Sequence, residues 1–369
     1  MNVLVLMPVA SRRGGAEELL NRFLLHATDM GPEWNVLFLE DGPFRGDLEQ
    51  RGIKTRVVEA GRLKKPFALL RAVRSVTAIA DETETDLIFS WMPKAHIYGG
   101  WAAQWAGCAA AWYQHGAPSL GWMDRLVTLQ PADAVIACSR HVAEMQSSLW
   151  PNRPTHVVHP AVDLETFDPD ALPSPTSVRR DFDLPAEGPI VGMVGRLQRW
   201  KGMHTFVDAL AAVLETHPQT RGVIVGGRHP HEADYADTLK RRVHDRAIGS
   251  SLSMVGHQSN VHRWMQAMDV VIHASDAEPF GMVVIEAMAL GKPVVAGASG
   301  GPAEIIDPGV NGLQAPYGDA RVLARHLRTL LDDPATARRI GAAGQKRAQA
   351  FSAHDFARQL TTTLQRIIR

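Results

Sequence analysis

Short apolar segments alternate with longer helical patterns along almost the whole of this 369-residue chain. Continuous apolar runs between turn residues are typical of parallel strands buried on both faces, and the helices between them provide the crossovers. The expected strands are Val3–Met7, Val36–Leu39, Thr55–Val58, Leu87–Ser90, Ala110–Tyr113, Ala134–Cys138, His156–Val158, Ile190–Val194, Gly222–Val225, Leu252–Val255, Val270–His273 and Pro293–Ala296. The expected helices are Glu17–Asp29, Pro66–Ile79, Ala95–Ala106, Ser119–Leu129, Arg140–Leu149, Met203–Thr216, Tyr235–Ala247, Val261–Met268, Val283–Leu290, Ala320–Leu331 and Phe351–Ile368. The pattern predicts a doubly wound α/β fold.

The alternation stops once, between Asp163 and Pro189, where the sequence becomes rich in proline and aspartate. This composition is typical of a linker. The chain is also longer than a single α/β core usually grows. We therefore expect a first Rossmann-like domain over residues 1–165, a linker over 166–188 and a second Rossmann-like domain over 189–350.

Charge and cysteine content narrow the classes of function. Lys plus Arg and Asp plus Glu number 39 each, so no overall charge field attracts nucleic acid, and any phosphate must be bound by a local site. The two cysteines, Cys108 and Cys138, lie in apolar sequence and are expected to be reduced thiols. Because the first residues also lack the basic region of a signal peptide, we expect a cytoplasmic protein.

The first domain contains an uncharged segment, Ala95–Trp112, that could be mistaken for a membrane span. It is rich in alanine and is interrupted by glycines, so a buried helix followed by a strand is expected instead. Most of the tryptophans in this domain are expected in the core, and one or two could stack against an acceptor. These tryptophans are Trp91, Trp101, Trp105, Trp112 and Trp122.

The stretch Ala277–Gly297 has the layout of a ligand cradle. Glu278 leads into a turn with Pro279 and Gly281, and Glu286 follows inside an apolar helical pattern. The first backbone amides of a helix have no partner within it, so they can hold an anion. Carboxylates beside them accept hydrogen bonds from hydroxyl groups. Phosphates and sugars offer those two kinds of partner.

A second loop follows the first expected strand of the second domain. It runs from Gly195 to Gly202 and carries Arg196 and Lys201. Cations at the carboxyl edge of a doubly wound sheet lie where such folds bind ligands, and an arginine with a lysine suits a diphosphate. The alternative is a pair of solvated loop cations; the flanking glycines and the matching cradle favour a binding role.

Two features of the first domain also follow expected strands. Gly14 and Gly15 open the first helix, where small residues let a ligand approach the backbone, although a turn that merely needs glycine is an equal alternative. His115 follows Ala110–Tyr113, and a neutral imidazole there could donate to a sugar hydroxyl or help with proton transfer. A structural role for His115 is the alternative when it is considered alone.

We expect no metal site. His229 and His231 lie in a proline-containing loop without a third well-spaced ligand, so they are expected to be solvated. A basic run, which includes Arg62, Lys64 and Lys65, leads into the amphipathic segment 66–79. A helix of this kind can bind an anionic lipid surface, although a core-packed helix with a solvated basic face is more common.

Taken together, these motifs resemble the retaining glycosyltransferases of family 4, which have the two-domain GT-B fold. Glu278 and Glu286 match the family's Glu-x7-Glu element, and the segment from Gly195 to Gly202 matches its Gly-Arg-x4-Lys-Gly element. The segment 14–17 resembles its N-terminal glycine loop, and the resemblance covers nearly the whole chain.

The resemblance implies two domains that face each other across an active-site cleft, with the final helix, residues 351–369, crossing back to the first domain. It implies that Arg196 and Lys201 bind the donor diphosphate, that Glu278 binds the transferred sugar and that Glu286 binds the ribose. It also implies donor contacts from the backbone at Gly15, Gly195, Phe280, Gly281, Met282 and Val283, and a sugar-facing His115.

The implied reaction is transfer of a sugar, most simply a hexose, from a UDP- or GDP-sugar to a hydroxyl acceptor, with retention of configuration and without a metal or other cofactor. Two alternatives stay open from the sequence. One is a GT-B epimerase or hydrolase of sugar nucleotides, which would consume the donor without an acceptor. The other is a non-catalytic sugar-nucleotide-binding protein, which would bind the donor and leave it intact.

Overall fold

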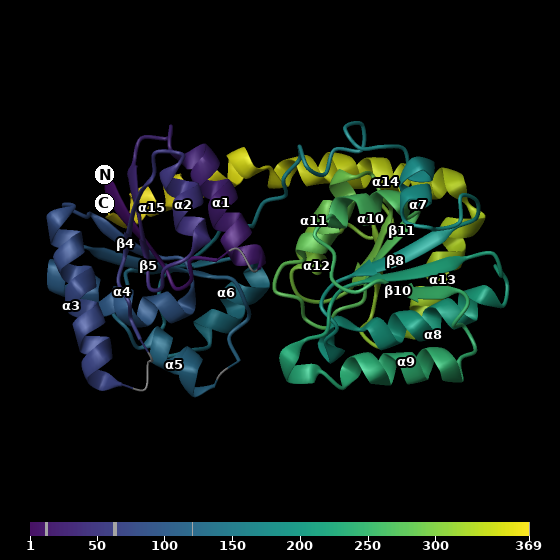
Figure 1. The fold of residues 1–369 in the computed structure, drawn as a ribbon, viewed down its shortest axis with the longest axis horizontal. Helices are drawn as coiled ribbons and strands as arrows, with labels where there is room; N and C mark the ends of the chain where they lie inside the picture. The colour runs from purple at the N-terminus through teal and green to yellow at the C-terminus, as the bar shows by residue number, and fades with distance from the viewer. Residues whose placement is uncertain (12–13, 62–64, 120, 369) are drawn as a thin grey trace. The chain divides into compact units, whose positions relative to one another are not determined.

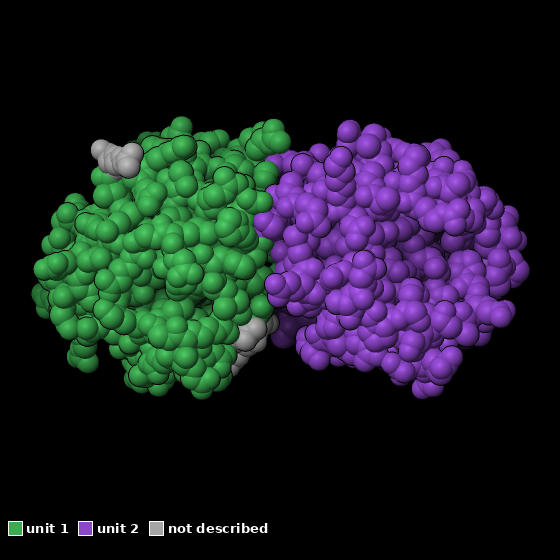
Figure 2. All heavy atoms as spheres, turned by 90° about the horizontal axis from the view of Figure 1, so that it is seen from above, with its two compact units in different colours: residues 1–161, 353–369 green, residues 162–352 purple. Residues whose placement is uncertain are grey.

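The computed structural model describes residues 1–11, 14–61, 65–119 and 121–368. It divides into two compact units (Figure 2). Unit 1 consists of Met1–Ala161 and Ala353–Arg369, and unit 2 of Val162–Ser352. Each unit has its own sheet in which all neighbouring strands pair in parallel, so the predicted doubly wound α/β class is confirmed.

The sheet of unit 1 has seven strands in the order β3-β2-β1-β4-β5-β6-β7. The strands are β1 Asn2–Met7, β2 Glu33–Phe38, β3 Lys54–Val57, β4 Leu87–Ser90, β5 Ala109–Gln114, β6 Ala134–Ala137 and β7 Thr155–Val157. The helices are α1 Gly15–Ala27, α2 Pro43–Glu49, α3 Pro66–Glu82, α4 Pro93–Ala106, α5 Trp122–Thr128, α6 Arg140–Ser147 and α15 Ala353–Ile368. Each strand expected from the sequence in this half overlaps an observed one.

Alternation along β1 divides the core of unit 1 between the two faces of the sheet. Leu4 and Leu6 pack with α3 and α4, which lie side by side on one face (Figure 1). The final helix, α15, packs against α1, and Phe356 of α15 contacts Phe23 of α1 with ring centroids 5.9 Å apart. The last segment of the chain is therefore part of the first unit, because its apolar stripe is buried there.

The sheet of unit 2 has six strands in the order β10-β9-β8-β11-β12-β13. The strands are β8 Ile190–Val194, β9 Arg221–Val225, β10 Leu252–Met254, β11 Val270–His273, β12 Val294–Gly297 and β13 Leu313–Ala315. The helices are α7 Pro175–Asp181, α8 Met203–Leu214, α9 Tyr235–Asp245, α10 Val261–Ala267, α11 Met282–Ala289, α12 Pro302–Ile305, α13 Ala320–Asp332 and α14 Pro334–Ala348. Short 3₁₀ turns cover Arg199–Lys201, Pro230–Glu232 and Gln349–Phe351. Helices α8, α9 and α13 pack together on one side of the sheet, whereas α11 packs with α14 (Figure 1).

Segment 166–188 is not a separate linker, as its composition suggested, but part of unit 2. It contains α7, which begins at Pro175 and is capped by the Ser174 hydroxyl. The helix is anchored by Arg179, whose guanidinium donates to the Ala267 carbonyl at 2.9 Å and to Asp269 at 2.7 Å. Phe182 also stacks on Trp264, with ring centroids 4.1 Å apart. Within this segment Pro175 starts a helix, and Pro189, which follows the segment, directly precedes β8.

Replacing Arg179 with methionine should destabilise unit 2. Arg179 is buried while Asp269 is about half exposed, so we expect a loss of about 2 kcal/mol, below the range for a fully buried ion pair. For a unit of this size that corresponds to a fall in Tm of about 4–8 °C, measurable by differential scanning calorimetry. The matched control is Arg180→Met, because Arg180 is the exposed neighbour on the same helix. Equal Tm values for the two variants would contradict the anchoring role.

Four further elements were not predicted from the sequence: helix α2 in the first half, and helix α12, strand β13 and helix α14 in the second. The tryptophans are also less buried than expected: Trp91 and Trp112 are in the core, but Trp101, Trp105 and Trp122 are exposed. The uncharged segment forms α4 and β5, as predicted. No helix within the described ranges is long and apolar enough to cross a membrane.

Candidate active site

The two loops singled out in the second half of the sequence come together at one point of the sheet of unit 2. Strand order reverses between β8 and β11, which are neighbours in the sheet although residues 195–269 lie between them along the chain.

 The intervening stretch, residues 195–269, runs from the end of β8 to the start of β11. At such a switch point the loops that leave the carboxyl ends of the two strands diverge and leave a crevice in which doubly wound folds bind ligands. The loop after β8 carries Lys201, and the loop after β11 carries Glu278.

Lys201 and Glu278 form an ion pair at this crevice. The ammonium Nζ lies 2.5 Å from Glu278 Oε2, and each side chain is 14% exposed. The ammonium also lies 4.0 Å from the centre of the Trp200 ring, a cation–π contact that orients the lysine further. An ammonium has three N–H donors, so Lys201 can hold the carboxylate and still donate to a second anion.

His273, the last residue of β11, also contacts the Glu278 carboxylate. It was not identified from the sequence. Its Nε2 lies 3.1 Å from Glu278 Oε2 and 3.2 Å from the hydroxyl of Ser275. One signal could have identified it: a histidine that ends a central strand lies at the carboxyl edge where sites gather. In the sequence it is one of 16 histidines, which hid that signal.

The environment of Glu278 keeps its carboxyl group ionised. Burial by itself raises the pKa of Glu278, but the hydrogen bond from His273 and the charge of Lys201 outweigh burial. The net result is a pKa well below the usual range of a glutamate. The side chain therefore acts as a hydrogen-bond acceptor at neutral pH.

Close approaches of the backbone shape the crevice. A Cβ on Gly202 would lie 2.1 Å from the Ala274 carbonyl oxygen, and one on Gly226 would lie 1.8 Å from the Gly195 carbonyl oxygen. Gly202 also has a φ of +76°, in the region that favours glycine. These glycines are needed because the loops that follow β8, β9 and β11 touch one another through their main chains.

Helix α11 begins at this crevice. Gly281, with a φ of +108°, caps it, so the amides of Met282 and Val283 lie in its first turn, where no partner within the helix is available. Phe280 is buried against Phe351, with ring centroids 5.7 Å apart. Glu286 is half-buried one turn into the helix. The residues predicted to bind the donor from this stretch thus lie on one loop and the first turns of one helix.

Arg196 lies beside Gly195 and is exposed. Its guanidinium makes no hydrogen bond or ion pair with the residues that the structure describes, whereas Lys201 in the same loop is paired. The two predicted phosphate-binding cations therefore differ: one is held by the protein, and the other is available to a ligand.

In unit 1, Trp91 links the glycine turn at the start of α1 with His115. Its indole Nε1 donates to the Ala16 carbonyl at the start of α1 at 2.8 Å, and its own carbonyl lies 2.7 Å from His115 Nε2. Neither Gly14 nor Gly15 has a positive φ, and a Cβ on Gly15 would point into open space. The turn does not need glycine there for its own conformation, which favours the interpretation that Gly15 leaves room for a ligand.

The geometry limits what His115 can do. Because a carbonyl oxygen only accepts, Nε2 carries the proton and donates to Trp91, which leaves Nδ1 as an acceptor. Burial lowers the pKa of His115 to about 4, so the ring is neutral at pH 7. Nε2 is therefore not available to donate to a sugar hydroxyl, which was the expected role.

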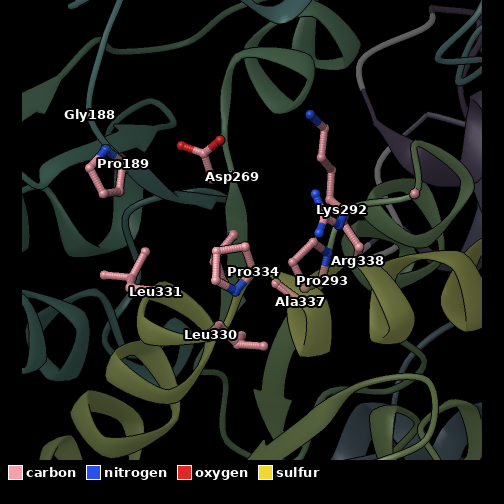
Figure 3. Close-up of a pocket in the computed structure, with 12 residues that line it drawn as sticks. Gly188, Pro189, Asp269, Lys292, Pro293, Leu330, Leu331, Pro334, Ala337 and Arg338 are labelled. Carbon is pink, nitrogen blue, oxygen red and sulfur yellow. The ribbon is translucent and has the colours of Figure 1, made fainter.

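A pocket of about 420 Å³ lies at the opposite edge of the sheet of unit 2, where β8, β11 and β12 begin. Figure 3 shows Pro189 and Leu331 on one side of it and Lys292 on the other. Two of its three charged lining residues are already used within the protein: Lys292 donates to the Gln266 carbonyl at 2.8 Å, and Asp269 accepts from Arg179. Burial lowers the pKa of Lys292 to about 8. The pocket lies between the starts of these strands and helices α13 and α14, away from the loops at the carboxyl edge of the sheet.

No group of three or more potential metal ligands occurs among the residues that the structure describes. His229 and His231 lie 5.5 Å apart by ring centroids in the loop after β9.

The structure has two doubly wound units, and unit 2 presents cations, free helix amides and carboxylates at its switch point. This is the construction of the GT-B glycosyltransferases. The family described as "Glycosyl transferases group 1" matches residues 176–347, and the family described as "Glycosyltransferase Family 4" matches residues 13–166. The chain belongs to the group 1 glycosyltransferases, and the predicted family is confirmed.

Similar solved structures support the same fold over the whole chain. The structure of HepE from Anabaena in complex with UDP has a TM-score of 0.86 at 29% identity and covers 99% of this chain and 100% of that chain. HepE is also known in complex with UDP-glucose, with a TM-score of 0.84.

Curated relatives have glycosyltransferase names. The chain is 33% identical over 221 residues to D-inositol 3-phosphate glycosyltransferase 1 of Catenulispora acidiphila, a match that covers 57% of this chain and 52% of the relative. It is 24% identical over 338 residues to the lipopolysaccharide core biosynthesis glycosyltransferase LpsE of Rhizobium meliloti, which covers 90% of each. The chain thus spans about half the length of the inositol-phosphate relatives that it matches.

Proposed function

We propose that this protein is a retaining glycosyltransferase that moves a sugar, a hexose in the simplest case, from a nucleotide-diphosphate sugar to a hydroxyl group of an acceptor. The observation that carries the proposal is the Lys201–Glu278 pair at the switch point of unit 2, with Arg196 on the same loop as the lysine. Membership of the group 1 family and the similarity to HepE, whose structures contain UDP and UDP-glucose, support it.

The charges of the site match the charges that the reaction develops. As the bond between sugar and diphosphate breaks, negative charge grows on the diphosphate, and Arg196, Lys201 and the first amides of α11 would stabilise it. These groups would supply the positive charge that a divalent cation provides in other enzymes, so we propose that the reaction needs no metal. The departing diphosphate would accept the proton of the acceptor hydroxyl on the face where the new bond forms, which retains the configuration.

The carboxylates would bind hydroxyl groups of the donor. Glu278 is ionised and beside Lys201, so it would accept a hydrogen bond from the transferred sugar, and Glu286 would accept from the ribose. For His115 we propose acceptance of a sugar hydroxyl at Nδ1. Gly15 and Gly195 would let the diphosphate approach the backbone, because a ligand can come closer to glycine than to any other residue.

A donor screen tests this function. UDP-, GDP- and ADP-sugars are added separately, and the Tm is measured; a donor at 100 times its Kd stabilises the folded protein by about 2.7 kcal/mol. The stabilising donor is then incubated with and without a panel of hydroxyl acceptors. Transfer only in the presence of an acceptor supports the proposal. Consumption without an acceptor identifies a hydrolase or epimerase, and binding without consumption identifies a sugar-nucleotide-binding protein.

We also propose a cytoplasmic protein that binds the inner face of a membrane through unit 1. The expected basic helix is α3, but Arg62 and Lys64 lie outside the described residues. Among the described residues, eight of the twelve exposed large apolar side chains lie on α3, α4 and α5 or at the end of α5, and Phe67 is 83% exposed. These eight residues, which we call the α3–α5 surface, are Phe67, Leu70, Trp101, Trp105, Trp122, Met123, Leu126 and Leu129.

The charges around the α3–α5 surface favour an anionic lipid surface. Exposed basic residues accompany it on or next to all three helices: Lys65, Arg71, Arg74, Lys94 and Arg125. The exposed acids of these helices, Asp81 and Glu82, lie in the last turn of α3. Tryptophan with lysine and arginine is the combination that binds at a membrane interface, where apolar and charged groups are adjacent. Neither Cys108 nor Cys138 forms a disulfide, which supports the cytoplasmic location.

Flotation with vesicles tests the surface. The protein should float with vesicles that contain phosphatidylserine at low salt and dissociate as the salt concentration rises. Trp101→Ser with Trp105→Ser, or Arg71→Glu with Arg74→Glu, should abolish flotation. Leu25→Ser on α1 removes an exposed apolar side chain outside the surface and should leave flotation unchanged. An unchanged vesicle-bound fraction in both double variants would exclude the α3–α5 surface.

A further inference from the structure

His273 has a feature that packing does not explain. Its side chain is 2% exposed, and the residues that precede it on β11, Val270, Val271 and Ile272, are all buried and apolar. Its Nδ1 is buried and has no hydrogen-bond partner within the described part of the chain. A buried polar atom without a partner costs free energy. An apolar side chain would fill this position without that cost, so the imidazole has another reason to be there.

We propose that His273 is a positioning residue that holds the carboxylate of Glu278 so that its Oε1 atom faces the transferred sugar. This inference rests on the proposed function, because it assigns an orientation to a carboxylate that would bind the sugar.

The hydrogen bonds to the Glu278 carboxylate that involve described residues all end on one oxygen. Oε2 accepts from Lys201 Nζ at 2.5 Å and from His273 Nε2 at 3.1 Å. Oε1 has no partner among the described residues. Lys201 follows β8 and His273 ends β11, and these two strands are neighbours in the sheet (Figure 1). Together the two donors determine the position and rotation of the carboxylate. Oε1 is then the oxygen that can accept a hydrogen bond from a sugar hydroxyl.

The chemistry of the contact assigns the tautomer. An ionised carboxylate only accepts, so His273 Nε2 must carry the proton, and Nδ1 is the unprotonated nitrogen. The Ser275 hydroxyl, 3.2 Å from Nε2 and 1% exposed, keeps the ring edge turned towards Glu278. A side chain that donates from the position of Nε2 should therefore be able to perform the role of His273, whereas an apolar side chain should not.

The first test measures turnover with UDP-glucose as the probe donor and affinity with UDP. For His273→Leu we expect kcat to fall about 10- to 100-fold, while the Kd of UDP, which lacks the sugar, stays within about twofold. His273→Gln, whose amide nitrogen reaches the place of Nε2, should recover most of the loss. The control is His326→Leu on α13, whose imidazole bonds to the Gln314 carbonyl outside the site; it should turn over like the wild type.

A double-mutant comparison separates positioning from general packing. If His273 acts through Glu278, then adding His273→Leu to Glu278→Gln should cause no further loss of kcat. A further tenfold loss in the double variant would overturn the proposal, as would a wild-type kcat in His273→Leu.

The second test does not depend on the donor. In nitrogen-15-labelled protein without ligand, long-range nitrogen–proton spectra should show His273 protonated at Nε2, with a downfield proton that shifts upfield in Glu278→Gln. An Nδ1-protonated ring overturns the positioning role even if UDP-glucose is not a substrate. Conversely, a correct tautomer with no binding of any sugar nucleotide would contradict the proposed function and leave the contact between His273 and Glu278 established.

Discussion

Replacing Lys201 with alanine should lower the rate of donor cleavage by a factor of about 100 to 1,000, the usual effect of removing one group that stabilises developing negative charge. Lys201 is expected to contact the diphosphate while it holds Glu278 at 2.5 Å, so its loss affects both the leaving group and the sugar. The measurement is the kcat for release of the nucleoside diphosphate from the donor that the thermal screen identifies.

Companion variants distinguish the two effects. Arg196→Ala removes a cation without a partner in the described residues, so it should lower kcat without changing the Tm. Arg199→Ala removes a cation of the same loop that is paired with Asp234 at 2.5 Å, and it should leave kcat unchanged. Donor cleavage at the wild-type rate in Lys201→Ala would contradict the assigned role.

The pH dependence of stability gives Lys201→Ala a second signature. The pKa of Glu278 is held below its usual range in the folded protein, in part by Lys201. A lowered carboxyl pKa contributes stability that is fully present above the unfolded pKa of about 4.3 and is lost as the pH falls through the folded pKa. The Tm difference between the wild type and Lys201→Ala should therefore be largest at neutral pH and should shrink below about pH 4.

Replacing Gly202 with alanine should lower kcat about 100-fold, because a shift of about 1 Å in a reacting group can have that effect. The added Cβ would lie 2.1 Å from the Ala274 carbonyl oxygen, which is backbone and cannot rotate away. The loops that carry Lys201 and Glu278 would have to separate, so activity and Tm should both fall.

The control for Gly202→Ala is Gly256→Ala. Gly256 has a φ of +73°, close to the +76° of Gly202, but a Cβ there would meet nothing within 4 Å. Gly256→Ala thus measures the cost of the conformation alone, about 1 kcal/mol. If Gly202→Ala is no less active and no less stable than Gly256→Ala, the close approach between the two loops does not shape the site.

Much of the fold could be predicted because buried parallel strands leave a direct mark on the sequence. The segments at Val3–Met7, Leu87–Ser90 and Ile190–Val194 are short apolar runs, and each is an observed strand or lies within one. Strand β13 was missed because its three residues, Leu313–Ala315, are too short to show a pattern.

The missed helices had local signals that the apolar pattern did not carry. Helix α14 begins with Asp333 and Pro334, and the Asp333 carboxylate accepts from the amides of Ala335 and Thr336. This is a capping sequence followed by proline in the first turn, but the helix contains few large apolar residues. Helix α7 was hidden in the same way by the prolines around Ser174.

The sequence by itself indicated which loops of this protein are expected to carry chemistry. Arg196, Lys201, Glu278 and Glu286 follow strands at the correct spacing, and the order of the motifs indicated the family, since both depend only on neighbours along the chain. Only the tertiary structure decided which oxygen of Glu278 is held and by which groups. Lys201 and His273 meet that oxygen because β8 and β11 are adjacent in the sheet, and strand order depends on long-range packing that local sequence patterns do not encode.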